Sequence, residues 1–218
     1  MIDSKPWAWD LVKPGAHSYW EVPADEFLPI VSRWKEKKYS RILDLGCGTG
    51  RHAIFLAQNG FAVDAFDLSS DGIDTLKEKA QNQNVSLEIQ VGDMLNLPYG
   101  ANMFDCVLAF HTIQHTDLAG VKEILQTIHR ILKPNGEAFL TLASKESSSW
   151  KTYTGQRIND YTLIKTEGPE IEVPHTYLNY EEVLEVLRDF TIIKMQQIMN
   201  YLPKQNKEFA HFFILVRK

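Results

Sequence analysis

The chain has 218 residues, a length typical of one domain with a full hydrophobic core. Its composition is that of a globular protein, and a formal charge of −5 argues against an obligatory nucleic-acid partner, because that affinity rests on Lys and Arg neutralising phosphates. No apolar run approaches the roughly 18 residues of a membrane span, and residues 1–7 lack the apolar core of a signal peptide. We therefore expect a cytoplasmic protein, a monomer or homodimer, with no membrane partner.

Cys47 and Cys106 are the only cysteines. Two cysteines are too few for a disulfide framework, and alone they cannot complete a structural zinc site. We expect two free thiols and no metal site.

From residue 41 onward, apolar strand-like runs alternate with segments of helical periodicity, which predicts a parallel sheet covered by helices. In the run at 85–91, apolar and polar residues alternate strictly, which is typical of a half-exposed strand near a sheet edge. The elements expected in the first half are a strand at 41–46, a helix at 49–59, a strand at 61–67, a helix capped by Ser69 or Ser70, a strand at 85–91 and a strand at 104–110.

The second half begins with a long amphipathic helix, for which Asp117 is the expected N-cap. The turn residues Pro134-Asn-Gly136 end this helix and lead into a fifth strand at 137–143. Residues 145–175 show no clean period, and because a structureless loop of about 30 residues is unusual in a compact domain, we expect short strands or a lid there. The last expected elements are a helix capped by Asn179 and two antiparallel strands near 191–198 and 209–217.

The most informative motif is Asp44-Leu-Gly-Cys-Gly-Thr-Gly50, at the junction of the first strand and the first helix. Glycines at alternate positions permit a sharp turn and close approach of a ligand to the backbone, and the helix that follows offers free N–H groups. Asp67, at the end of the second strand, can accept both hydroxyls of an adenosine ribose, whether in NAD or in S-adenosylmethionine. Gly92-Asp93-Met94 favours the second ligand, because Asp93 can accept from an adenine amino group while Met94 packs against the ring.

With these motifs, and with Phe104-Asp-Cys-Val-Leu-Ala-Phe110 and Ile131-Leu-Lys-Pro-Asn-Gly136, the chain resembles the class I S-adenosylmethionine-dependent methyltransferases that act on small molecules. The resemblance implies an α/β fold, a Rossmann-like three-layer sandwich with a seven-stranded, mostly parallel sheet and an antiparallel last strand. It implies one methyltransferase domain over 1–218, with an N-terminal helical cap at 1–40 and an insertion at 145–178 that shapes the substrate site.

The resemblance also assigns the cofactor, S-adenosyl-L-methionine, whose product is S-adenosyl-L-homocysteine, and the residues that hold it. The methionine part falls to Asp44 and the glycine loop, the ribose to Asp67, and the adenine to Leu68, Asp93 and Met94. Phe110 and His111 should border the sulfonium, and aromatic rings of the N-terminal segment should fold over it. The expected cofactor-binding residues are Tyr19, Trp20, Asp44, Gly46, Cys47, Gly48, Gly50, Asp67, Leu68, Asp93, Met94, Phe110 and His111.

A general base is needed only if the acceptor must lose a proton, and His111, His115 and His175 are the candidates for it. His52 is expected to face outward from the first helix. The fourth strand ends in Phe110-His-Thr-Ile113 rather than in an Asn-Pro-Pro-Tyr type of sequence, so DNA adenine methylation is not favoured and a small-molecule acceptor is. Two alternatives stay open: an NAD-dependent oxidoreductase, and a catalytically silent S-adenosylmethionine-binding regulatory protein.

Overall fold

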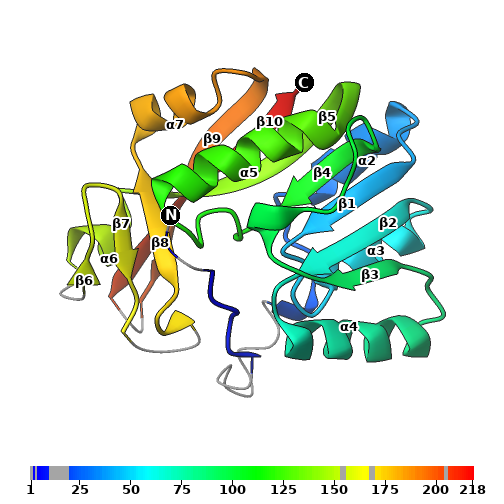
Figure 1. Cartoon of the computed structure of the whole chain (residues 1–218), viewed down its shortest axis with the longest axis horizontal. Helices are drawn as coiled ribbons and strands as arrows, with labels where there is room; N and C mark the ends of the chain where they lie inside the picture. Colours follow the sequence, from blue (N-terminus) through cyan, green and yellow to red (C-terminus); the bar gives the residue numbers. More distant parts are fainter. Residues whose placement is uncertain (1, 3, 10–19, 153–155, 167–169, 204–205) are drawn as a thin grey trace.

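The computed structural model describes residues 2, 4–9, 20–152, 156–166, 170–203 and 206–218 (Figure 1). The helices are α2 (Leu28–Glu36), α3 (Arg51–Gln58), α4 (Ser70–Asn82), the 3-10 helix η2 (Met94–Asn96), α5 (Leu118–Ile131), α6 (Ser148–Lys151) and α7 (Tyr180–Val186). The strands are β1 (Arg41–Leu45), β2 (Ala62–Asp67), β3 (Glu88–Val91), β4 (Phe104–Ala109), β5 (Leu132–Ser144), β6 (Gln156–Arg157), β7 (Thr162–Ile164), β8 (Pro174–Leu178), β9 (Thr191–Leu202) and β10 (Lys207–Arg217).

The main sheet runs in the order β3-β2-β1-β4-β5-β10-β9. Strands β1 to β5 pair in parallel, whereas β10 pairs antiparallel with both β5 and β9. The expected mostly parallel seven-stranded sheet with an antiparallel last strand is therefore confirmed. β3 is the edge strand, and its residues are exposed or half-buried, as the alternation at 85–91 predicts.

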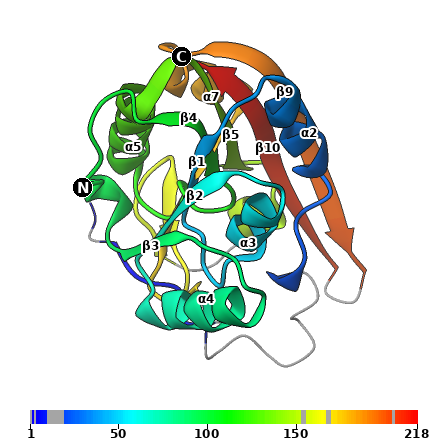
Figure 2. The same ribbon diagram turned by 90° about the vertical axis from the view of Figure 1, so that its right-hand side faces the viewer.

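Helices cover both faces of the sheet, so the predicted three-layer arrangement is also confirmed. One core cluster joins the buried faces of α5 and α7 to the sheet, and the other joins α2, α3 and α4 to the opposite face. Figure 2 shows α5 on one side of the strands and α2 and α3 on the other. Among the helices described, none is long and apolar enough to cross a membrane.

Local sequence signals place most of the helix ends. The side chain of Ser69 accepts a hydrogen bond from the Gly72 N–H at the start of α4, and Asp117 accepts from the Gly120 N–H at the start of α5. The helix expected at 49–59 begins at Arg51 instead, because Gly50 is left-handed, with φ of 86°. The polypeptide therefore turns through the last glycine before helical geometry starts.

β5 begins earlier than the turn residues Pro134-Asn-Gly136 suggest. The strand starts at Leu132, directly after α5, because the buried Leu132 already pairs with Phe104 of β4. The turn signal appears instead as an irregularity in this pairing, with Asn135 at φ of 64°. Proline and glycine here deform a strand rather than separate two elements.

Residues 145–178 contain α6 and the short strands β6, β7 and β8. Ala143 and Ser144, at the end of β5, pair in parallel with Tyr177 and Leu178 of β8, and β7 pairs antiparallel with β8. In Figure 1, β6, β7 and β8 lie at the left and β3 lies at the right. This segment therefore extends the sheet at the carboxyl end of β5, on the edge where open α/β sheets bind ligands.

Candidate functional site

The glycine loop after β1 adopts a conformation that side chains would block. Gly46, Gly48 and Gly50 have φ of 72°, 53° and 86°. A Cβ on Gly46 would lie 2.0 Å from Thr112 Oγ1, and a Cβ on Gly50 would lie 2.1 Å from Leu76 Cδ1. Glycine is therefore required both by the backbone and by the packing around it.

Asp44, just before this loop, carries an unsatisfied carboxylate. The residue is 1% exposed, and its Oδ2 has no hydrogen-bond partner among the described residues. Burial raises the pKa of Asp44 to about 7, although Arg51 opposes the shift. Burying a carboxylate oxygen without a hydrogen-bond partner lowers the stability of the fold. Such an oxygen next to the glycine loop therefore indicates a site for a cationic or hydrogen-bond-donating group.

Asp67 ties the end of β2 to the glycine loop. Its Oδ2 accepts from the Gly48 N–H at 2.7 Å and its Oδ1 accepts from the Ser69 N–H at 2.8 Å. Burial raises its pKa despite these hydrogen bonds. Each carboxylate oxygen retains acceptor capacity beyond one N–H, so Asp67 can still receive hydroxyl donors.

Asp93 follows β3 and caps η2. Its Oδ1 accepts from the Leu95 N–H at 2.9 Å and from the Ser4 hydroxyl at 3.0 Å. The N-terminal segment therefore reaches the position where the sequence predicts an adenine contact. Asp44, Asp67 and Asp93 belong to the carboxyl ends of β1, β2 and β3, which are consecutive in the sheet.

One pocket gathers most of the residues predicted for the cofactor. Asp44 and Gly50 flank the loop but do not line this pocket, and Tyr19 lies outside the described residues. The predicted residues that line it are Trp20, Gly46, Cys47, Gly48, Asp67, Leu68, Asp93, Met94, Phe110, His111 and His115.

Three tryptophans of the N-terminal segment pack together over this pocket. The Trp7 ring centroid lies 4.6 Å from those of both Trp9 and Trp20. Trp9 also covers the glycine loop, because a Cβ on Gly48 would lie 2.5 Å from its Cζ2. The aromatic segment thus folds over the predicted cofactor position.

Arg51 and Thr112 are among the lining residues that the sequence did not identify. Arg51 Cζ lies 5.1 Å from the Trp20 ring centroid and 5.3 Å from that of Phe110. Thr112 packs against Gly46 and also lines the pocket. The position of Arg51 directly after the third glycine, at the start of the helix, was the one available signal.

His111 and His115 line the pocket as half-buried, neutral imidazoles. Burial and the neighbouring His211 lower the pKa of His111 well below its ordinary value. Burial and His175 lower the pKa of His115 to about 3. His175 does not line the pocket, although its ring centroid lies 4.6 Å from that of His115.

The expectation for His52 is wrong. Its side chain is buried, lies between Phe27 and Phe110, and accepts a hydrogen bond from the Ala24 N–H through Nε2. Residues Ala24 and Phe27, which precede β1, cover this face of α3, and helical periodicity alone does not show that contact.

The cysteines behave as expected. Cys47 and Cys106 are both buried and free. Cys106 pairs with Ile42 near the start of β1, whereas Cys47 follows the end of that strand. Burial raises the pKa of the Cys47 thiol well above its ordinary value, so it is unsuited to act as a nucleophile.

Residues 42–136 match the family described as the methyltransferase domain. A methyltransferase of Geobacillus sp. (strain WCH70) is 33% identical over 135 residues, which cover 55% of this chain and 53% of the relative. The ubiquinone biosynthesis O-methyltransferase of Rickettsia akari is 28% identical over 170 residues, which cover 76% of this chain and 64% of the relative. Each match thus spans less than two thirds of the curated relative.

The solved structures show the same fold. An S-adenosylmethionine-dependent methyltransferase from Methanosarcina mazei superposes with a TM-score of 0.74 at 20% identity, covering 87% of this chain and 97% of the other. Together with the domain match and the relatives, these findings agree with the motifs and the strand order. Residues 42–136 thus match a methyltransferase domain, and the chain has the fold of the S-adenosylmethionine-dependent methyltransferases.

Proposed function

We propose that this chain transfers a methyl group from S-adenosyl-L-methionine to a small-molecule acceptor and releases S-adenosyl-L-homocysteine. The observation that carries the proposal is the row of carboxylates Asp44, Asp67 and Asp93 at the ends of three consecutive strands. Neighbouring strands lie about 4.8 Å apart, so the row follows the length of an extended ligand. S-adenosylmethionine carries its hydrogen-bond donors in the same order: the ammonium group would face Asp44, the ribose hydroxyls Asp67 and the adenine amino group Asp93.

The residues around the row fit this cofactor. Asp44 flanks the glycine loop rather than lining the pocket, and its unpartnered oxygen would hold the ammonium group at that end of the ligand. The glycine loop leaves room for the methionine part. Leu68 and Met94 line the pocket near Asp93 and would flank the adenine ring. Trp20 and Phe110 would lie near the sulfonium, to which their ring faces are attracted.

The cofactor supplies an activated methyl group, so the protein needs mainly to align the acceptor in line with it and to exclude water. The aromatic rings of Trp7, Trp9 and Trp20 give the pocket an apolar cover. Because His111 and His115 have lowered pKa values, they are neutral but weak proton acceptors at pH 7. This favours an acceptor that is already nucleophilic or easily deprotonated.

The acceptor side of the pocket is proposed to lie toward residues 145–178. This segment extends the sheet where β5 ends, and His175 from it contacts His115 of the pocket. The net charge of −5 supports a small molecule rather than a nucleic acid. A cytoplasmic location and a monomeric or homodimeric state remain predictions from the sequence.

The test is turnover of a methyl-labelled donor with a panel of small-molecule acceptors, led by ubiquinone precursors because one relative acts in ubiquinone biosynthesis. We expect labelled product with at least one acceptor and its loss in Asp67→Asn. Asp74→Asn, at an exposed position of α4, is the matched control and should leave turnover unchanged. Donor binding without turnover across the panel would support the silent regulatory alternative instead.

A further inference from the structure

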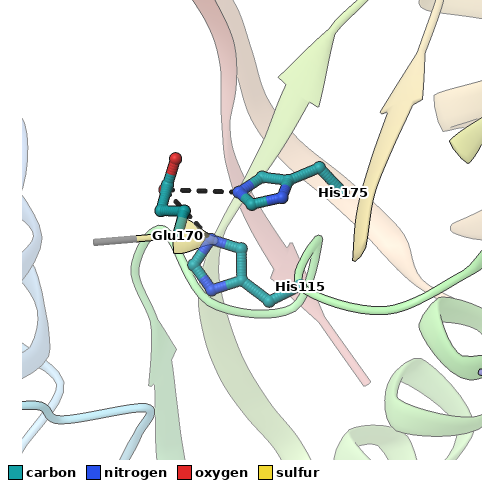
Figure 3. A group of neighbouring side chains, drawn as sticks. All are labelled: His115, Glu170 and His175. Carbon is teal, nitrogen blue, oxygen red and sulfur yellow. Dashed lines mark ion pairs between the residues drawn. The ribbon is translucent and has the colours of Figure 1, made fainter. Parts of the chain in front are cut away.

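Three side chains from separate segments converge next to the cofactor pocket. His115 follows β4, His175 lies on β8, and Glu170 lies on the loop before β8 (Figure 3). Glu170 Oε1 lies 3.2 Å from His175 Nε2 and 3.8 Å from His115 Nε2. Glu170 was not singled out from the sequence, because its segment shows no periodicity and its partners lie elsewhere in the chain.

A contact with the backbone sets the tautomer of His175 and so determines which ring nitrogen has a free lone pair. His175 Nδ1 lies 2.9 Å from the Val173 carbonyl oxygen, which can only accept, so Nδ1 carries the proton. In the neutral ring Nε2 is then unprotonated and available as a ligand atom. This arrangement, a histidine whose other nitrogen donates to a carbonyl, is the usual second-shell support of a metal ligand.

His175 Nε2 is a buried atom that forms no hydrogen bond within the described chain. The nearby Glu170 Oε1 is within range, but the contact lacks hydrogen-bond geometry. Two lone-pair atoms that face each other at this distance repel unless a cation lies between them. A second proton on His175 or a metal ion between the two atoms would remove the repulsion between His175 Nε2 and Glu170 Oε1. The poor hydrogen-bond geometry of this contact favours the metal ion.

The ligand spacing fits a divalent metal. With metal–ligand bonds of about 2.0–2.2 Å, tetrahedral ligand atoms lie about 3.3–3.6 Å apart, close to the 3.2 and 3.8 Å separations found here. All three ligand atoms lie within 4.8 Å of one another. Lys165 Nζ holds the other oxygen of Glu170 at 2.6 Å, which orients the carboxylate with Oε1 toward the histidines.

Metal ligands must be deprotonated before an ion binds, and the Lys165 ammonium 2.6 Å from Glu170 favours the carboxylate form of that side chain.

We propose that His115, Glu170 and His175 form a binding site for a divalent transition metal such as zinc, with a coordination position left open toward the cofactor pocket. Two histidines and one carboxylate leave such a position in zinc enzymes and in non-haem iron sites. His115 belongs both to this cluster and to the pocket lining. The open position would take an oxygen or sulfur atom of the methyl acceptor, a role that rests on the proposed function, whereas ion binding does not.

The test is calorimetric titration of the chelator-treated full chain with Zn²⁺, and separately the visible absorption of its Co²⁺ form, both without methyl donor. We expect one equivalent of metal and a Co²⁺ spectrum of low coordination number. Glu170→Gln and His175→Ala should each weaken Zn²⁺ binding by about a hundredfold or more, since loss of second-shell partners alone costs about 10–100-fold. His129→Ala, which removes a histidine of α5 packed against Phe190, should bind Zn²⁺ like the wild type.

Failure of the wild type to bind stoichiometric Zn²⁺ or Co²⁺ would overturn the proposal and leave an ion pair between Glu170 and a protonated His175. Binding that survives both Glu170→Gln and His175→Ala would overturn it as well. Circular dichroism and S-adenosylhomocysteine binding establish that the variants are folded. Because the metal titration contains no donor, its failure is distinguishable from a failure of the proposed methyl transfer.

Discussion

At the scale of the residue, the ligand-binding role proposed for Asp44 comes at the expense of stability. Its carboxylate is buried beside the glycine loop with one oxygen unpartnered, and burial raises its pKa from 3.8 to about 7. In the unfolded chain this carboxyl ionises near its ordinary pKa, whereas in the fold it stays protonated to higher pH. Stability should therefore fall as the pH rises from about 4 to about 7.

Asp44→Asn should remove this decrease in the free energy of unfolding between about pH 4 and about pH 7. The pKa shift corresponds to about 4 kcal/mol of destabilisation above pH 7, and because Asn still buries a polar amide, we expect a gain of about 1–3 kcal/mol at pH 8. At pH 4 the variant and the wild type should differ little. Urea unfolding of both proteins across this pH range measures the effect, and an unchanged pH dependence would contradict it.

The same substitution should weaken cofactor binding, because the ammonium group of the ligand loses its charged partner. A hydrogen bond to a charged group contributes about 1.5–3 kcal/mol, so we expect affinity for S-adenosylhomocysteine to fall about 10- to 100-fold. Asp74→Asn, on the exposed face of α4, should change neither stability nor affinity.

At the scale of the element, α2 is fastened to β5 by a buried carboxylate. The Glu137 side chain is fully buried, Arg33 donates to both of its oxygens at 2.9 and 2.8 Å, and Lys37 lies 3.4 Å away. Despite burial, Arg33 lowers the pKa of Glu137 from its ordinary 4.5. The carboxylate therefore contributes stability above pH 4.5 that is lost as the pH falls through the lowered pKa.

Arg33→Ala should destabilise the fold by about 2–3 kcal/mol, somewhat less than the usual loss for a broken buried pair, since Lys37 remains. In the Glu137→Gln background, Arg33→Ala should lower the free energy of unfolding by less than it does in the wild type, because no unpaired buried charge is left. Urea unfolding at pH 7 tests both. Equal costs of Arg33→Ala in the two backgrounds would show that the pair does not couple.

The sequence predicts elements well where local signals suffice. Periodicity and the caps Ser69 and Asp117 place α4 and α5, and alternation identifies β3 as an edge strand. It fails where a distant partner decides, as for β5, whose start depends on pairing with Phe104. The candidate site follows the same rule. Asp67 and Asp93 lie in motifs that the sequence shows, whereas the role proposed for Glu170 depends on the long-range packing of β8.

At the scale of the whole molecule, both ends of the segment 4–9 reach the pocket proposed for the cofactor. Ser4 donates to Asp93, and Trp9 covers Gly48. A ligand that donates to Asp93 Oδ1 must compete with the Ser4 hydroxyl and the Leu95 N–H for that oxygen. The segment is therefore expected to exchange its contacts when the cofactor binds.

Ser4→Ala should tighten S-adenosylhomocysteine binding about two- to tenfold, since it frees Asp93 from one competing hydrogen bond of about 0.5–1.5 kcal/mol. Ser32→Ala, at an exposed position of α2, should have no effect. Weaker binding in Ser4→Ala would mean that Ser4 helps to hold the ligand rather than competing with it.

The most direct test of the account is calorimetric titration of the full chain with S-adenosylhomocysteine and, in parallel, with NAD. The row of carboxylates and the glycine loop predict one S-adenosylhomocysteine site per chain, weakened in Asp44→Asn, and no comparable binding of NAD. Selective binding of NAD, or no binding of S-adenosylhomocysteine by the folded wild type, would contradict it.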